Sequence, residues 1–135
     1  MSTLKVNNLQ DINGANNSTP VEIANGRAKA WVHFNGTGGT SPFTLANGGI
    51  KNSYNVTSVT DNSAGNYTAN MSITMSDNRF CVVGGGSQGV LNDNVMGFYP
   101  NTTTSFKLIS NNQTGNLNAG EDAAFMGAAV FGDLA

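Results

Sequence analysis

Alternation of apolar and polar side chains begins in residues 27–39, RAKAWVHFNGTGG. Every second position up to residue 34 is apolar, and these positions are Ala28, Ala30, Val32 and Phe34. The positions between them carry Lys29, Trp31 and His33. Because successive side chains of a strand point to opposite faces, this period of two predicts a β-strand. The glycines that follow Asn35 predict a hairpin turn, since glycine accepts the left-handed backbone that such turns need.

A second alternating region, residues 54–75, predicts an antiparallel hairpin. Residues 66–75 alternate without interruption, and their apolar positions are Tyr67, Ala69, Met71, Ile73 and Met75. Residues 54–60 alternate less regularly, and the shift between Val56 and Val59 predicts a β-bulge that exchanges the two faces. The turn between the two runs is expected at residues 61–65, DNSAG, which are turn formers.

Short apolar runs predict three more strands, at residues 80–83, 95–99 and 102–110. Pro100 and Asn101 separate the last two, because proline lacks the amide proton that a sheet uses. The glycine-rich run 84–89 is expected to open a loop that extends to about residue 94. Residues 111–120 are expected to form a polar loop. Residues 41–49 are expected to form another loop, earlier in the chain.

The last element, residues 123–131, is apolar throughout, which predicts a strand that is covered on both faces. Alanine and methionine also favour a helix there. Gly127 and Gly132 argue against the helix, because glycine costs a helix about 1 kcal/mol per residue. We therefore expect a final strand.

The N-terminal segment, residues 2–25, offers few apolar side chains to a core. A short β-prone run at residues 3–6 precedes the polar tract 7–20, which is rich in turn formers. A segment of this composition gains order by docking on something else. We expect residues 1–25 to form an arm and residues 26–135 to form a sandwich domain. Docking of the arm on its own domain and on a neighbouring subunit both remain open.

The composition favours many short strands over long helices. Only 10% of the 135 residues are charged, and 17 are glycine. Glycine and asparagine suit tight turns, threonine suits a pleated surface, and a chain of this length can bury a core of its own. We predict one all-β domain, an antiparallel β-sandwich of jelly-roll-like or immunoglobulin-like type, with an extended N-terminal arm.

The charge pattern argues against nucleic-acid and membrane partners. Six basic and eight acidic residues give a net charge of -2, and the basic residues are scattered along the chain. Nucleic-acid binding requires a clustered cationic surface that releases phosphate counterions. The N-terminus lacks the pattern of a signal peptide, and no apolar run reaches the roughly 18 residues of a membrane span. We therefore expect synthesis in a cytoplasm.

Catalytic and metal sites lack the residues that they need. Hydrolytic triads and common zinc sites require histidine or several thiolates, and the chain has one histidine, His33, and one cysteine, Cys81. Cys81 is expected to act as a small hydrophobic residue of a strand rather than as a reactive thiol. Glu121 and Asp122 are adjacent in a predicted loop, where side chains more often point apart than together, so solvated surface acids are expected instead of a glycosidase pair.

The glycine run 84–89 matches the spacing of a dinucleotide-binding fingerprint, but the residues after it do not. The fingerprint needs a helix that holds the pyrophosphate and an acidic residue about 20 positions further on. Residues 90–100 have no helical pattern, and Ile109 stands where the acid belongs. No calcium loop of alternating acids is present either. We therefore predict no cofactor, no metal ion and no enzymatic activity.

Trp31 and His33 on the polar side of their strand leave two interpretations. The pair could stack on a sugar ring, which would make the domain a carbohydrate-recognition module for a host surface. Alternatively, Trp31 packs in the core between two sheets or in a contact with another subunit, because tryptophan is highly buried on average.

Five separated segments, in this order, resemble a known type of domain. They are RAKAWVHFNGTG, SYNVTSVTDNSAGNYTANMSITM, RFCVVGGG, TTTSFKLISNNQTG and AAVFGD. Together they resemble a β-rich module that recurs in virion appendage proteins of marine tailed phages, with cyanophage tail fibres as the clearest case. The similarity covers residues 27–133, and the opening STLKVNNLQD is similar to leaders that precede the module. Residues 41–49 depart from the pattern by lengthening the first loop.

This resemblance implies a structural role in a virion and a β-sandwich fold. Because the chain is short and starts at its own methionine, we expect a capsid-decoration protein or a small appendage subunit, of the fibre or knob kind, rather than a domain on a long shaft. The implied partners are other virion proteins of capsid or tail and further copies of the chain, with a homotrimer compatible with both locations. Recognition of a host-surface glycan is the alternative role.

Overall fold

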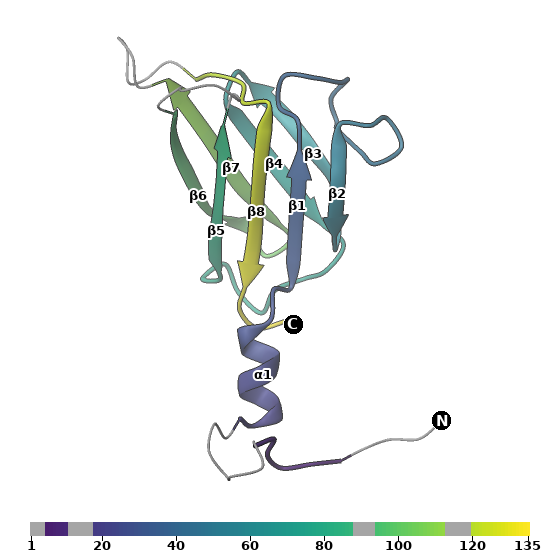
Figure 1. The fold of residues 1–135 in the computed structure, drawn as a ribbon, viewed down its shortest axis with the longest axis vertical. Coiled ribbons are helices and arrows are strands. Elements are labelled where there is room, and N and C mark those ends of the chain that lie inside the picture. The colour runs from purple at the N-terminus through teal and green to yellow at the C-terminus, as the bar shows by residue number, and fades with distance from the viewer. Residues whose placement is uncertain (1–4, 11–17, 88–93, 113–119) are drawn as a thin grey trace.

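The computed structural model describes residues 5–10, 18–87, 94–112 and 120–135. Within these residues it contains one short helix and eight strands (Figure 1). In chain order they are α1 (Pro20–Gly26), β1 (Ala30–Phe34), β2 (Ile50–Tyr54), β3 (Val56–Ser63), β4 (Asn66–Met71), β5 (Cys81–Ser87), β6 (Asn94–Thr102), β7 (Ser105–Asn112) and β8 (Phe125–Phe131).

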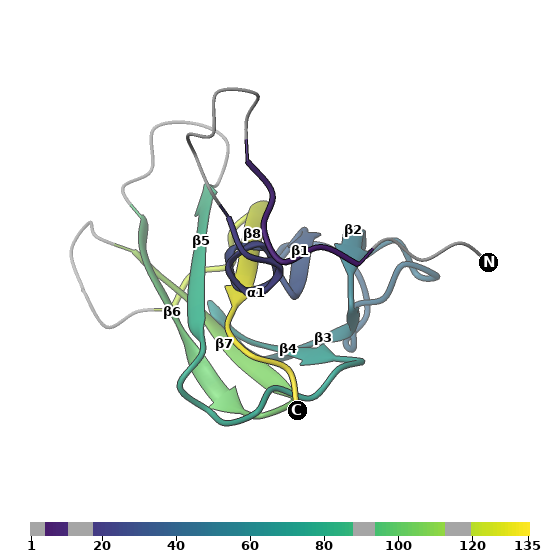
Figure 2. The same ribbon diagram turned by 90° about the horizontal axis from the view of Figure 1, so that it is seen from below.

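The strands form two four-stranded antiparallel sheets that pack face to face (Figures 1 and 2). The front sheet has the order β2-β1-β8-β5, and the back sheet has the order β3-β4-β7-β6. The predicted antiparallel β-sandwich is therefore confirmed. The first strand, β1, pairs with the last, β8. In an immunoglobulin sandwich the first and last strands lie in different sheets, so the order found here differs from the immunoglobulin type.

The core consists of alternate residues of the paired strands, as the period of two requires. The inward side chains of β1, β4, β7 and β8 are buried, and they are Ala30, Val32, Phe34, Tyr67, Ala69, Met71, Phe106, Leu108, Met126, Ala128 and Val130. Removing these apolar side chains from water is the main term that favours folding. The alternation predicted for residues 27–39 is confirmed as β1.

The region of residues 41–49 adds a core residue that its expected loop character did not indicate. Phe43 is buried, and its backbone exchanges two hydrogen bonds with Val59, of 2.7 and 2.9 Å. Its ring lies 6.1 Å from Phe34 and 6.3 Å from Tyr67, measured between ring centroids. Phe34 and Tyr67 meet edge to face at 5.1 Å, a favourable aromatic geometry. This lengthened segment therefore closes one end of the sandwich.

The predicted hairpin of residues 54–75 is confirmed as β3 paired with β4. The register shifts between Val56 and Ser58, inside the interval that the sequence predicts for a bulge. The turn is shorter than residues 61–65, because β3 continues to Ser63. Gly65 has a φ of +67°, and a Cβ there would lie 2.0 Å from the Ser110 carbonyl oxygen, so only glycine fits this turn.

Two strand boundaries of the second region differ from the prediction. β4 ends at Met71 rather than at residue 75, because the backbone N–H of Met75 donates to the Thr103 carbonyl and no longer continues the β4 ladder. β2 was not predicted, since its sequence IKNSY has no alternation. Asn55 makes the corner between β2 and β3 with a φ of +54°, and its side-chain amide donates to the Lys29 carbonyl over 2.8 Å.

The prediction that the glycine run starting at residue 84 is a loop was wrong for residues 84–87, which continue β5. A Cβ at Gly84 would lie 2.8 Å from the Phe98 ring, and one at Gly86 would lie 2.7 Å from the Met96 methyl group. Glycine is needed because β5 and β6 close one side of the sandwich there. Residues 88–93, the rest of the predicted loop, lie outside the described residues.

The predicted break at Pro100 and Asn101 was also wrong. Both residues belong to β6, and Pro100 pairs with Phe106 of β7. β6 is an edge strand of the back sheet, so a missing amide proton there need not cost a hydrogen bond of the sheet. β7 continues to Asn112, beyond the predicted residue 110, and residues 113–119 of the second predicted loop are not among those described.

The strand predicted at residues 123–131 is confirmed as β8, and the helical alternative is excluded. The prediction that this strand is covered on both faces was wrong. Met126, Ala128 and Val130 are buried, whereas Phe125 on the opposite face is 54% exposed and its outward neighbours are half-buried. The outward face of β8 is therefore apolar without being enclosed.

The arm contains a helix that was not predicted. Thr19 caps α1, since its hydroxyl accepts from the Glu22 N–H over 3.2 Å and the Glu22 carboxylate accepts from the Thr19 N–H over 2.7 Å. Pro20 occupies the first turn, which also favours a helix start. α1 projects from one end of the sandwich below β1 and β8 (Figure 1), and none of its residues is buried. The described part of the arm therefore does not pack on its own domain.

Candidate functional site

The outer surface of the front sheet is the most distinctive surface of the described chain. We call the outward side chains of β2, β1, β8 and β5 the front face, and they are Asn52, Tyr54, Trp31, His33, Phe125, Gly127, Ala129, Phe131, Cys81, Val83, Gly85 and Ser87. None of these positions is Asp, Glu, Lys or Arg. The one such residue in the four strands is the exposed Lys51, at the irregularity of β2, whose ammonium group donates to the Gly48 carbonyl over 2.8 Å. A solvent-facing sheet surface normally carries charged residues, so this face is unusually apolar.

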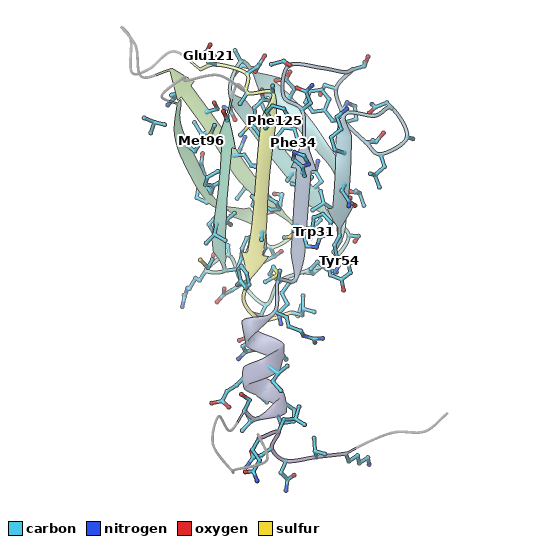
Figure 3. The ribbon with its side chains drawn as sticks, viewed as in Figure 1. Trp31, Phe34, Tyr54, Met96, Glu121 and Phe125 are labelled. Carbon is cyan, nitrogen blue, oxygen red and sulfur yellow. The ribbon has the colours of Figure 1, made fainter. Side chains whose placement is uncertain are left out.

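Trp31 forms the lower end of the front face together with Tyr54. The two residues are opposite one another in the β1–β2 register, and Tyr54 is 52% exposed (Figure 3). They line an open hollow of about 390 Å³, whose other lining residues are Arg27, Ala28, Lys29, Asn55 and Leu134. Two aromatic rings beside an amide and two cationic groups can stack on a flat ligand and also hydrogen-bond to it.

The position of Trp31 excludes one part of its second interpretation, which was packing in the core or against another subunit. Trp31 lies on the outer surface and is half-buried, so packing in the core between the sheets was wrong. Its inward neighbours Ala30 and Val32 occupy that core instead, because the strand period places Trp31 on the other face. Contact with another subunit and stacking on a sugar both stay predictions. His33 is exposed and lies one row away, opposite Asn52.

The centre of the front face is made of small residues. Gly127 of β8 pairs with His33 on one side and with Gly85 on the other. Nothing lies within 4 Å of where a Cβ of Gly85 would be. Phe125 stands above this shallow centre at the upper end of β8 (Figure 3). The front face thus has aromatic side chains at both ends and a low middle.

Cys81 lies at the edge of the front face, on β5, and its thiol is exposed. The predicted strand location of Cys81 is confirmed, but its side chain faces outward instead of packing as a hydrophobic residue of the core. Val82 takes the inward position against the core, so Cys81 and Val83 point outward. Sequence reasoning also missed Tyr54, Val83 and Phe125 as surface residues, because only the sheet register shows that they share a face with Trp31.

The outer surface of the back sheet, the back face, has the opposite character. Its amide and hydroxyl side chains bind one another: the Asn70 amide donates to the Ser58 and Thr60 hydroxyls at 3.0 and 3.2 Å. The Asn62 amide likewise donates to the Thr68 hydroxyl over 3.0 Å. These polar groups of β3 and β4 therefore satisfy each other, whereas the edge strand β6 of the same face carries Val95 and Tyr99, which are 46% and 47% exposed.

Acidic side chains gather near the turn between β3 and β4. The Asp122 carboxylate accepts hydrogen bonds from the Gly65 N–H, over 2.8 Å, and from the Tyr67 hydroxyl. Burial raises the pKa of Tyr67 far above its usual range, and the Asp122 carboxylate raises it further. Burial also raises the pKa of Asp61, with a smaller contribution from the charge of Asp122. One oxygen each of Asp61 and Glu121 is buried without a hydrogen-bond partner in the described structure.

Asp122 has a clear role within the fold. Asp122 joins the loop before β8 to the β3–β4 turn, so the expectation of a solvated surface acid was wrong for it. Within the residues that the structure describes, no three His, Cys, Asp or Glu side chains are placed to share a metal ion. In the same residues, no helix is both long and apolar enough to cross a membrane.

The described part of the arm carries a second hollow, of about 480 Å³, between residues 5–9 and α1. Its apolar lining residues are Val6, Leu9, Pro20, Ile23 and Ala24. Leu9 is 50% exposed, and its backbone pairs with that of Ser18 through two hydrogen bonds of 2.8 Å. Arg27 borders both this hollow and the one at Trp31.

The fold and this surface define a small antiparallel β-sandwich with one largely apolar outer face. Comparisons with protein-family models, with curated proteins and with solved structures found no significant match. The resemblance to a phage virion module therefore stays a prediction that rests on the five sequence segments.

Proposed function

We propose that the chain is a non-enzymatic structural subunit of a tailed-phage virion, of the capsid-decoration or small-appendage type. One observation carries this proposal: a largely apolar front face, with Lys51 as the one charged residue of its described strands, on a chain whose back face is more polar. Such a face is costly to leave in water, and proteins that keep one generally cover it in an assembly. The five-segment resemblance supplies the kind of assembly.

The rest of the molecule suits this role. The sandwich is closed by the aromatic cluster at one end and by the tight β5–β6 contact at one side, so it can act as a rigid block. The described part of the arm projects from the opposite end without burying a residue of α1. A projecting segment of this kind gains order by lying on a neighbour. Capsid and tail proteins are the neighbours that the resemblance implies.

The direct test is the composition of purified virions of a phage that encodes the chain. We expect mass spectrometry to find the chain in particles purified by density gradient, and cryo-electron microscopy to show a β-sandwich density at symmetric positions. A matched sample of host lysate without particles controls for carry-over. Absence of the chain from particles, although it is made during infection, would contradict the proposal.

A second function is favoured by the hollow at Trp31. Tyr54 and Trp31 present two rings beside Asn55, which is the arrangement that a sugar-binding site needs for stacking and hydrogen bonding. This would make the chain a receptor-binding module for a host-surface glycan.

Trp31 is the only tryptophan, so its fluorescence reports directly on this hollow. A carbohydrate-recognition role predicts that host-surface polysaccharide shifts this fluorescence in a saturable way, and that immobilised polysaccharide retains the chain. The Trp31→Ala variant should lose retention, whereas Tyr99→Ala, which removes an exposed ring from the back sheet, should keep it. Equal retention of both variants would rule out this site.

A further inference from the structure

We propose that the front face is the surface through which copies of this chain associate, so that its occupant is another copy of the same chain. The inference rests on the proposed assembly function and deepens it, because it names a partner and the side chains that meet it.

The first argument is the pattern of the face. In the register of the front sheet, Tyr54, Trp31, Ala129 and Val83 form one continuous row across all four strands. Tyr54 and Val83, at the two ends of this row, are 52% and 47% exposed. The next row contains Asn52, His33, Gly127 and Gly85, and its half on β8 and β5 is low because both glycines lack a side chain. Ridges beside a low row are the relief that lets two sheets pack closely.

The second argument is charge. The front sheet carries one charged side chain within the described strands, the exposed Lys51 at the irregular end of β2. The rows that contain Trp31 and His33 carry none, so two copies can meet across these rows without repulsion between like charges. These rows also offer nothing that would select a charged partner. The back face is polar over β3 and β4, where Asn70 and Asn62 bind neighbouring hydroxyls, and its exposed large apolar side chains, Val95 and Tyr99, lie on the edge strand β6. The surface of this chain that matches the front face is therefore the front face of another copy.

The third argument is area. Four strands about 4.8 Å apart, each with about seven residues at 3.3 Å per residue, cover roughly 400 Å². A stable interface needs about 800 Å² from each partner. The hollow at Trp31 and the hollow of the arm both include Arg27, so the two hollows adjoin and apolar side chains of the arm can supply part of the remaining area. Leu9 and Val21, which are 50% and 66% exposed, add apolar area there.

The experiment compares two variants that add the same charge at the middle of either outer surface. Ala129→Glu places a carboxylate in the central row of the front face, and Thr68→Glu places one at the centre of the back face. Light scattering after size exclusion should give the wild-type chain a multiple of its 14.0 kDa mass. Ala129→Glu should raise the dissociation constant at least about 100-fold, since a buried unpaired charge costs several kcal/mol. Thr68→Glu should behave like wild type.

A second measurement does not depend on whether Ala129→Glu folds. Cys81 is the only cysteine and is exposed at the edge of the front face, so its reaction rate with a thiol reagent reports on coverage of that face. In the wild-type chain the rate should fall at least about tenfold as the concentration rises through the dissociation constant. Thr68→Glu should show the same fall, and Ala129→Glu should react rapidly at every concentration.

Three results would overturn the inference. They are a wild-type chain that stays monomeric up to 1 mM, association that Ala129→Glu leaves unchanged, and a Cys81 rate that does not fall while the mass increases. A monomer whose Trp31 fluorescence responds to polysaccharide would assign the face to a glycan instead. A monomer that is nevertheless present in purified virions would refute self-association and leave the proposed function standing. An oligomer that forms through the front face but is absent from virions would support self-association and contradict the proposed function.

Discussion

Three consecutive glycines in β5 show how one residue type can be required at one position and optional at the next. A Cβ at Gly84 would lie 2.4 Å from the Gly127 carbonyl oxygen and 2.8 Å from the Phe98 ring, whereas a Cβ at Gly85 would meet nothing within 4 Å. We expect Gly84→Ala to lower the free energy of unfolding by about 1–3 kcal/mol, as overpacking does. Gly85→Ala should change it by less than about 0.5 kcal/mol.

Urea unfolding of both variants at low protein concentration, where association through the front face is negligible, measures this difference. The matched pair controls for the general effect of replacing glycine by alanine in a strand. Equal loss of stability in the two variants would mean that the sheets are not in close contact at β5 and β6.

The hydroxyl of Tyr67 is a buried donor to the Asp122 carboxylate, with the Gly36 carbonyl also within 3.3 Å. Because burial and Asp122 raise the pKa of Tyr67 far above its usual range, the phenol remains protonated and can keep donating. Tyr67→Phe should therefore lower the free energy of unfolding by about 1.5–3 kcal/mol, the usual value of a hydrogen bond to a charged group. Tyr99→Phe, at an exposed position, should have no effect, and thermal unfolding of both variants tests this.

The raised pKa of Asp61 predicts that the free energy of unfolding depends on pH. Burial raises its pKa in the folded state, so the folded chain binds the proton more tightly than the unfolded chain. The contribution of this group is therefore most favourable below the ordinary pKa of 3.8 and is lost as the pH rises through the folded-state value. Asp61→Asn should be more stable than wild type at pH 7, by less than about 1 kcal/mol because the site is partly exposed. The difference should disappear towards pH 3.5.

The midpoint of thermal unfolding between pH 3.5 and 7.5 measures this effect. Asp133→Asn, at an exposed carboxylate, serves as the control and should follow the wild-type curve. An Asp61→Asn variant that is less stable than wild type at pH 7 would show that the ionised carboxylate is stabilised instead.

Among the elements, α1 is the one that its own sequence defines without burying any side chain. Its capping box of Thr19 and Glu22 and its early proline define the helix, yet none of its residues is buried. Thr19→Ala should destabilise the helix by about 1 kcal/mol and increase amide hydrogen exchange in residues 20–26. The urea midpoint of the sandwich should not change. A shift of that midpoint would show that the arm supports the domain after all, and deletion of residues 1–25 would then shift it too.

The same elements show which parts of the fold can be derived from the sequence. β1, β3, β4 and β8 bury one face each, so their alternation or apolar character identifies them. β2 and the glycine part of β5 have no such pattern, because their residues are fixed by pairing with β1 and by the closeness of β6. The front face could not be derived from the sequence, since Trp31, Tyr54, Val83 and Ala129 come from four strands and meet only through the sheet register.

For the whole molecule, the contrast between the two outer surfaces determines how association should respond to its surroundings. In the described strands the front face carries one charged residue, Lys51, at the irregular end of β2. Association driven by such a face should depend little on sodium chloride, because there are few ion pairs to screen. It should weaken on cooling, because burial of apolar surface becomes less favourable at low temperature. Sulfate, which is excluded from protein surfaces, should strengthen it.

Sedimentation measured at 5 and 25 °C, and in 0.05 and 0.5 M sodium chloride, separates this contact from an electrostatic one. We expect tighter association at 25 °C and less than about a threefold change in the dissociation constant between the two salt concentrations. The Thr68→Glu variant should show the same behaviour, because its added charge lies on the back face. A steep loss of association in salt would assign the contact to charged groups such as Arg27 and Lys29 at the base of the arm, and the apolar face would then need another explanation.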